Sequence, residues 1–283
     1  MQNKLRLRLL AFLPALTLLA AACANGGSDV PKATGTPATP SPNSSASSSP
    51  SAVASVSPGN ADALPEFFGS DFDSGSSFCT FHDQVVSVSA DLLTVIYPAG
   101  STAPSMGAPY GGAQICEPFA SGPRTSATLT YKVRFPSSFQ FVKGGKLPGL
   151  YGGVEPFSGG GHNVKGWSAR LMWRPGGAGE IYAYFAGTTG YGLQIGLGSF
   201  YWPANGQWQT VSLQIVLNSP GQSNGQAVLL INGHVVIDAG SLDITTTATP
   251  IDGLFFSSFY GGHDPSWAPS AQTSLQFADF SAS

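Results

Sequence analysis

Trp167 to Phe185, WSARLMWRPGGAGEIYAYF, has the pattern of two strands joined by a glycine-rich turn. Side chains point alternately to opposite faces along a strand, so each strand here has one polar and one apolar face. The apolar faces are expected to point into the core. The polar faces carry Ser168, Arg170, Met172 and Arg174 on the first strand, and Glu180, Tyr182 and Tyr184 on the second.

The position of the turn decides which of these side chains meet. We place the turn at Pro175 to Gly179, and antiparallel pairing then sets the register. The predicted opposite pairs are Arg170 with Tyr184, Met172 with Tyr182, and Arg174 with Glu180. The third pair is interpreted as a cross-strand ion pair rather than as catalytic machinery. A serine, an arginine and two tyrosines are therefore expected to converge on one patch.

The rest of the chain shows short β-branched and aromatic runs separated by turns, and no clear amphipathic helix. Asn232-Gly233, between two apolar runs, predicts a two-residue hairpin. The pattern predicts an all-β fold, a two-sheet β-sandwich of jelly-roll type with a concave binding face. Further strands are expected at residues 85–89, 92–97, 125–135, 192–197, 208–217, 226–231, 235–238, 254–260 and 274–280.

Two glycine-rich segments precede the central strands. Phe139 to Gly153 is interpreted as a binding loop around Lys146, because glycine lets the backbone approach a ligand closely. Local sequence equally allows Lys146 to be a solvated loop residue. Pro156 to Gly166 is interpreted as a lid over the site.

Charge indicates the class of partner. Only 10% of the 283 residues are charged and the net charge is -3, which argues against a nucleic-acid binder. The basic residues of the domain fall within about fifty positions, a clustering that favours an anion-binding cleft unless the strands distribute them over different faces. They are Arg124, Lys132, Arg134, Lys143, Lys146, Lys165, Arg170 and Arg174.

The N-terminus has the features of an export signal. Residues 1–22 combine basic residues with an apolar run too short to span a bilayer, and they end before Cys23. The preceding residues resemble a bacterial lipobox, so we expect Cys23 to be lipidated; ordinary cleavage that leaves Cys23 unmodified is the alternative. Residues 23–62 are rich in Ser, Pro and Ala and predict a disordered tether, and 63–283 form the folded domain. The protein is thus expected to be a cell-envelope lipoprotein or a secreted protein.

Cysteine and histidine usage bears on stability and on metals. Cys79 and Cys116 are expected to form a disulfide in an oxidising compartment, with two free buried thiols as the alternative. No cysteine and histidine spacing predicts a zinc site, and we expect no metal and no cofactor.

Four ordered motifs carry a resemblance to a known family. They are GGKLPGLYGG, WSARLMWR, GEIYAY, and LFFSSFYGG followed by Trp267. Together they resemble polysaccharide lyase family 14, which includes alginate and glucuronan lyases, over most of residues 120–283. The resemblance implies a jelly roll with its active cleft on a concave sheet. It places the functional residues at Lys146, Ser168, Arg170, Tyr182 and Tyr184.

Such a lyase removes the proton beside the uronate carboxylate and expels the glycosidic oxygen, so its site must stabilise an enolate-like dianion. Arg170 suits the carboxylate, because a guanidinium donates two parallel hydrogen bonds. Tyr182 and Tyr184 are assigned jointly to acid and base work, with Lys146 as carboxylate neutraliser or alternative base. Further substrate contacts are expected from Trp173, His162, Asn163, His263 and Trp267.

The expected activity is metal-independent β-elimination on an anionic polysaccharide, by a monomer that touches the membrane only through Cys23. A noncatalytic carbohydrate-binding lipoprotein is the main alternative. A hydrolase would need two facing carboxylates, and Glu180, the acid on the central face, is expected to pair with Arg174. The polymer, the cleavage mode and the division of roles among the tyrosines and the lysine are left open.

Overall fold

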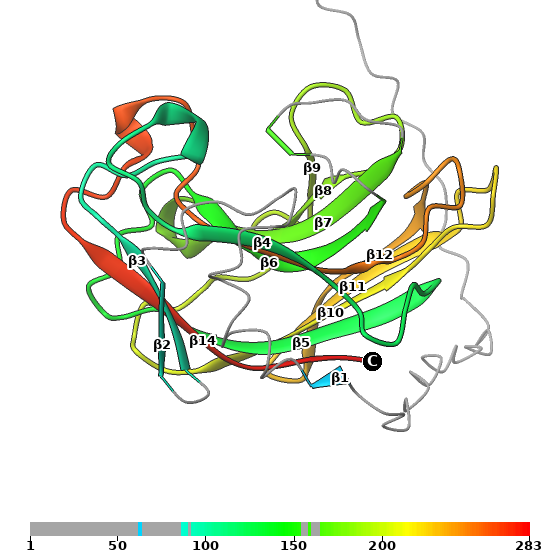
Figure 1. Ribbon diagram of the computed structural model, residues 1–283, viewed down its shortest axis with the longest axis horizontal. Coiled ribbons are helices and arrows are strands. Elements are labelled where there is room, and N and C mark those ends of the chain that lie inside the picture. Colours follow the sequence, from blue (N-terminus) through cyan, green and yellow to red (C-terminus); the bar gives the residue numbers. More distant parts are fainter. Residues whose placement is uncertain (1–61, 64–85, 90–91, 154–157, 160–164) are drawn as a thin grey trace, which may run out of the picture. The chain divides into compact units, whose positions relative to one another are not determined.

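The structure, a computed structural model, describes residues 62–63, 86–89, 92–153, 158–159 and 165–283, and its regular secondary structure is almost entirely β-strand (Figure 1). They belong to a compact unit that spans Ser55–Ser283. The predicted signal peptide, almost all of the predicted tether, and Cys23 lie outside the described residues. Within the described ranges, no helix has the length and apolar character needed to span a membrane.

The described strands form two antiparallel sheets (Figure 1). In the first sheet the order is β12-β11-β10-β5-β14-β3-β2, and β1 also pairs with β14; in the second it is β4-β13-β6-β7-β8-β9. This arrangement confirms the predicted all-β, two-sheet sandwich. The strands of the first sheet are β1 (Asp62–Ala63), β2 (Val86–Ser89), β3 (Leu92–Tyr97), β5 (Ser126–Arg134), β10 (Gln209–Val216), β11 (Gly225–Ile231), β12 (His234–Leu242) and β14 (Thr273–Ala282). Those of the second are β4 (Ala113–Pro118), β6 (Gly145–Gly153), β7 (Gly166–Trp173), β8 (Gly179–Tyr184), β9 (Leu193–Ile195) and β13 (Gly253–Ser258), and short 3-10 helices occur at η3 (Pro104–Met106), η4 (Pro175–Gly177) and η5 (Pro265–Trp267).

The core lies between the two sheets and is filled by alternate residues of their strands. β5 buries every second residue, from Ala127 to Val133, and leaves the intervening polar residues partly exposed. The predicted apolar face of β7 and β8 lies wholly in this core. It consists of Ala169, Leu171 and Trp173 on β7, and Ile181 and Ala183 on β8.

The opposite face of β7 and β8 is also covered, because every residue of both strands is buried. Met172, Tyr182 and Tyr184 form a separate apolar cluster on it. The side chains expected on an open sheet face are therefore recessed or covered, and burial strengthens electrostatic interactions among them.

The segment Phe139 to Gly153, interpreted above as a binding loop, is instead mostly the central strand β6. Its glycines are required by close packing of neighbouring backbones. A Cβ atom added to Gly149 would lie 1.9 Å from the carbonyl oxygen of Ala169 on β7. Lys146 is therefore held on a rigid strand, which fixes its side chain better than a loop would.

The predicted hairpin at Asn232-Gly233 is confirmed. Ile231 pairs with His234, and the two residues between them have positive φ angles of 52° and 80°. Two consecutive residues with positive φ are typical of the tight turn that matches the twist of two strands.

The β7–β8 pairing differs from the predicted register by two residues. Trp173 pairs with Gly179, and the amide of Arg174 donates to the carbonyl of Ala178 (2.8 Å). The turn therefore begins at Pro175 as predicted but ends at Gly177 rather than at Gly179. As a result Arg170 lies opposite Tyr182 rather than Tyr184. Because two residues are one full period of a strand, every side chain keeps its predicted face.

Candidate active site

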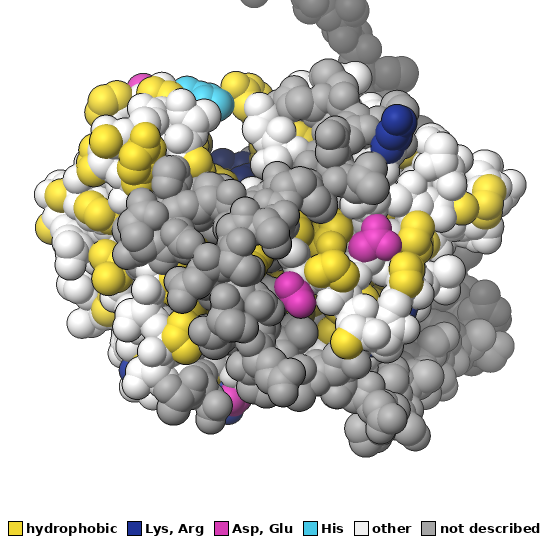
Figure 2. Space-filling model, viewed as in Figure 1, with side chains coloured by type: hydrophobic (Ala, Val, Ile, Leu, Met, Phe, Trp, Pro, Cys, Tyr) yellow, Lys and Arg dark blue, Asp and Glu magenta, His cyan; other side chains and the backbone are white. Residues whose placement is uncertain are grey.

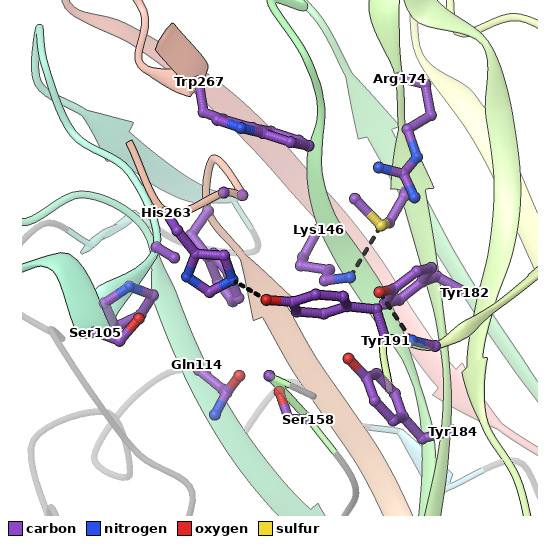
Figure 3. A pocket seen from close by; sticks show the side chains of 18 of the residues that line it. Ser105, Gln114, Lys146, Ser158, Arg174, Tyr182, Tyr184, Tyr191, His263 and Trp267 are labelled. Carbon is purple, nitrogen blue, oxygen red and sulfur yellow. Dashed lines mark hydrogen bonds between the residues drawn. The ribbon is translucent and has the colours of Figure 1, made fainter. Parts of the chain in front are cut away.

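A cavity of about 690 Å³ opens on the outer face of the second sheet. Figure 2 shows basic side chains recessed in a hollow of the molecular surface. Figure 3 shows side chains from several strands and loops pointing into the cavity. The residues that line it are Ala103, Pro104, Ser105, Gln114, Lys146, Ser158, Gly159, Met172, Arg174, Tyr182, Tyr184, Tyr191, Gly192, Gln194, Phe259, Gly261, Gly262, His263 and Trp267.

Lys146 projects into this cavity from β6 and is only 8% exposed. Its Nζ atom donates to the Met172 sulfur at 2.9 Å and lies 3.2 Å from the centre of the Tyr182 ring (Figure 3). Burial lowers the pKa of Lys146 well below its usual value, and the positive charges of Arg170 and Arg174 lower this pKa further. The amine is thereby prepared to lose its proton and to act as a base.

Tyr182 and Tyr184 stand side by side on β8. Their ring centroids are 5.5 Å apart and the rings are nearly perpendicular. The amide of Gly192 donates to the Tyr182 hydroxyl at 3.0 Å, and a Cβ at Gly192 would crowd both rings. Burial raises the pKa of Tyr182 above its usual value, and hydrogen bonding with Tyr184 raises it further. Tyr182 therefore keeps its proton and is suited to donation rather than to base catalysis.

Arg170 lies beneath the cavity and is not part of its lining, which corrects the expectation that it faces the cleft. Its terminal nitrogens donate to Ser257 Oγ and Ser158 Oγ, both at 3.2 Å, and its guanidinium carbon lies 4.5 Å from the Phe255 ring centre. Ser257 in turn donates to Gln114 Oε1 in the cavity wall (2.9 Å). Burial lowers the pKa of Arg170 to about 10, so it remains charged at neutral pH. The hydrogen bonds through Ser257 and Gln114 therefore connect the positively charged Arg170 to the cavity wall.

Arg174, by contrast, lines the cavity and also forms the predicted ion pair. Its Nε atom is 2.6 Å from Glu180 Oε1, and the carboxylate is fully buried. Burial raises the pKa of Glu180, while Arg174 opposes this shift. The Arg174 guanidinium carbon is 5.4 Å from the centre of the Tyr182 ring. Arg174 is therefore a cation of the cavity wall. The sequence did not predict this role, because Arg174 was assigned to an ion pair and an ion-paired residue was taken to lie outside the site.

The outer part of the cavity is formed by side chains from loops. Tyr191, before β9, hydrogen-bonds through its hydroxyl to Nε2 of His263, which follows β13 (3.0 Å; Figure 3). Trp267 of η5 also lines the cavity, with Lys143 Nζ 5.9 Å from its ring centre. The structure thus brings His263 and Trp267, both expected to contact substrate, into one cavity with Lys146.

Not all predicted site residues share this location. Ser168 is on the predicted face but is buried and absent from the cavity lining. His162 and Asn163 lie outside the described residues. Cys116 is disulfide-bonded, and because Cys79 is also outside the described residues, their pairing stays a prediction.

Trp173 does not contact the cavity, and its expected role in substrate binding is corrected. The indole is fully buried between the sheets and donates to the carbonyl of Phe141 at 3.1 Å. It makes edge-to-face contacts with Tyr97, Phe139 and Tyr260, at centroid distances of 6.3, 5.3 and 5.3 Å. The alternation of β7 already placed Trp173 on the apolar face, opposite to Met172.

The basic cluster is divided among several places. Among the basic residues of the described chain, Lys146 and Arg174 line the cavity, with Arg170 beneath it. Lys132 and Arg134 are on the outer face of the first sheet, where Lys132 is ion-paired with Asp279. The anion-binding cleft predicted from clustering therefore has fewer cations than the sequence interval suggested.

Gln114 and Gln194 were not predicted from sequence. Gln114 lies on β4, a strand that was not predicted from the sequence. The alternation of the polar Gln114 with the buried Ile115 is the local pattern that could have indicated this strand. Gln194 projects from the short edge strand β9. Within the described residues, no group of three or more His, Cys, Asp or Glu side chains is arranged to hold a metal ion.

Comparison with known proteins gives this geometry a family. The sequence profile of polysaccharide lyase 14 matches residues 86–280. A marine PL-14 alginate lyase from Aplysia kurodai is 28% identical, with a TM-score of 0.63 over 72% of this chain and 88% of that chain. The folds of alginate lyase Aly36B (24% identity, TM-score 0.62, 75% and 87% covered) and alginate lyase vAL-1 from Chlorella virus (18%, 0.61, 73% and 90%) are also similar. No protein with a curated description matches the chain. Because the profile covers well over half of its length, the chain belongs to polysaccharide lyase family 14.

Proposed function

We propose that this protein is an exported lyase that cleaves an anionic uronate polysaccharide, of the alginate or glucuronan type, by metal-independent β-elimination. One observation carries the proposal: a buried lysine with a lowered pKa lies beside two tyrosines in a single cavity. The similar Aplysia protein is described as an alginate lyase. Structures of Aly36B variants contain alginate trisaccharide and tetrasaccharide.

The proton beside the uronate carboxylate is removed by Lys146. A base must be neutral at working pH, and burial together with nearby arginines favours the neutral amine. Tyr182 is less suited to this step, because its pKa is raised. The structure therefore supports Lys146 over Tyr182 as the base, among the roles that the sequence left open.

The leaving glycosidic oxygen takes its proton from the tyrosine pair. Tyr184 lines the cavity, and the hydroxyl of Tyr182 is held by the Gly192 amide. We assign the proton donation to Tyr184. Tyr182 positions Tyr184, and its ring faces the Lys146 amine at 3.2 Å, where it stabilises the ammonium that forms once Lys146 has taken the proton. Once protonated, Lys146 is close enough to this pair to return its proton after product leaves.

The negative charge that develops on the carboxylate is stabilised by the cavity wall and by the layer beneath it. Arg174 and the side-chain amides of Gln114 and Gln194 belong to the lining. Arg170 adds a buried positive charge behind Gln114. The described lining contains neither Asp nor Glu, whereas a glycoside hydrolase needs a pair of carboxylates across the bond.

A substrate screen tests the proposal. Purified protein is mixed with polymannuronate, polyguluronate, glucuronan and a neutral glucan, and the ultraviolet absorbance of unsaturated uronate ends is followed. At least one polyuronate is expected to give product, at a rate that chelator does not change. Binding of a polyuronate without any unsaturated product would favour the noncatalytic carbohydrate-binding alternative.

The pH profile of kcat/KM tests the assignment of the base. The rate is expected to rise as Lys146 loses its proton, with an inflection well below the ordinary lysine value of 10.5. The charge of Arg174 lowers the pKa of Lys146 and that of Glu180 raises it. Arg174→Gln should therefore move the inflection to higher pH, and Glu180→Gln should move it to lower pH. An inflection that neither substitution moves would show that another group is the base.

Export and anchoring are proposed from the N-terminal sequence. The short apolar run ends at Cys23, and a Ser/Pro/Ala-rich stretch follows it. Mass spectrometry of the mature N-terminus is expected to find a lipidated Cys23. A mature chain that retains unmodified Cys23, or that begins downstream of it, would contradict the anchor.

A further inference from the structure

Arg134 lies far from the cavity, on the outer face of the first sheet, at the end of β5. Its guanidinium carbon is 4.6 Å from the centre of the Trp208 ring, and its Nε atom donates to Gln276 Oε1 at 2.5 Å. The Gln276 amide is itself oriented, because its nitrogen donates to Thr94 (3.3 Å). The guanidinium is thus held in one orientation by a stacked ring on one side and a fixed amide at its edge.

This arginine borders a hollow of about 180 Å³, lined by Arg134, Pro136, Gly206, Ser274 and Gln276. Within the described chain no carboxylate pairs with Arg134, and its two terminal nitrogens make no hydrogen bond. The neighbouring Lys132, by contrast, is paired with Asp279. The hollow therefore presents an oriented, uncompensated cation and the hydroxyl of Ser274.

We propose that this hollow is a second saccharide site, which binds the carboxylate of a single uronate unit on the sandwich face opposite to the active cavity. The two free nitrogens of Arg134 match the two oxygens of a carboxylate. At about 180 Å³ against about 690 Å³ for the active cavity, the hollow suits one sugar unit rather than a stretch of polymer. The choice of a uronate as the ligand rests on the proposed function. The observation that Arg134 is an oriented cation is independent of that function.

The consequence for the enzyme is retention on polymer. A polysaccharide bound at the outer face has its other segments held near the active cavity. This raises the effective concentration of those segments without any new contact in the cavity. Short oligosaccharides are too small to gain from this effect, because the two sites are on opposite sheets. A purely structural Arg134, which only covers Trp208, would affect stability and leave binding unchanged.

The test uses the full chain carrying Lys146→Met, so that ligands are not cleaved. Titration calorimetry with mannuronate, guluronate and glucuronate tetrasaccharides is expected to show two binding events with at least one of them. Adding Arg134→Gln should weaken one event at least about tenfold, as expected for loss of a bidentate charged pair, and spare the other. The matched control is Arg124→Gln, which removes another ring-stacked arginine (4.5 Å from the Phe119 ring centre) and should change neither event.

The outcomes separate this proposal from the proposed function. Absence of any Arg134-dependent event with all three ligands, or equal binding of neutral cellotetraose at the same event, overturns the second site. An Arg134-dependent event in a protein whose wild-type form yields no unsaturated product supports the second site and contradicts the lyase.

Discussion

Lys146→Met is expected to lower kcat/KM on polyuronate by about 10²- to 10⁴-fold, the usual contribution of a general base. Methionine keeps the length and much of the volume of the buried side chain, so packing against Met172 and Tyr182 is largely preserved. The loss of activity therefore reflects removal of the base and not a disturbance of packing. It is measured as the initial rate of unsaturated product at saturating and limiting substrate.

Two further substitutions make this result specific. Lys146→Arg keeps a cation at the site but cannot lose its proton, so it should be as inactive as Lys146→Met. Recovery of most activity by arginine would mean that Lys146 neutralises the carboxylate instead of removing a proton. Lys132→Met, at an ion-paired lysine on the other sheet, should leave the rate unchanged.

Trp173→Ala is expected to lower the free energy of unfolding by about 3–5 kcal/mol, the range for removing a large aromatic side chain from a core. The indole is fully buried and contacts the rings of Tyr97 on β3 and of Phe139 and Tyr260, so its loss leaves a void among them. Chemical denaturation monitored by circular dichroism measures the change. An unchanged midpoint would show that Trp173 is not part of the core.

Trp267→Ala provides the comparison, because this indole lines the cavity and is only partly buried. It should raise KM while costing much less stability than Trp173→Ala. A variant pair with the opposite behaviour, in which Trp173→Ala raises KM without loss of stability, would restore the role in substrate binding that the structure has corrected.

The period of two along a strand explains why the face of each side chain was predictable. The strand residues between 168 and 184 fall on their predicted faces although the register was wrong, because a register shift of two residues keeps each side chain on the same face. The turn itself was not predictable from its glycines alone. The position of the turn is fixed by the hydrogen bond from the Arg174 amide to the Ala178 carbonyl. Glycine-rich loops of several lengths could place such a bond, so the glycines alone do not identify the paired residues.

Depth of burial was the main property that the sequence did not reveal. Arg170 and Ser168 share a face with Tyr182, yet other parts of the chain cover them, and such long-range packing leaves no local pattern. β6 was mistaken for a loop for a related reason. Its glycines indicated flexibility by composition, whereas they accommodate a neighbouring backbone, as at Gly149.

The most direct test of the central claim is mass spectrometry of the products formed in water labelled with heavy oxygen, using the polyuronate that the screen identifies. Elimination breaks the glycosidic bond without adding water, so the new sugar end should lack one water relative to a hydrolysis product and carry no label at the cleaved bond. The Lys146→Met protein should form this product at least about 10²-fold more slowly. Fragments that contain one labelled oxygen at the new end and no unsaturation would show hydrolysis and would contradict the lyase assignment.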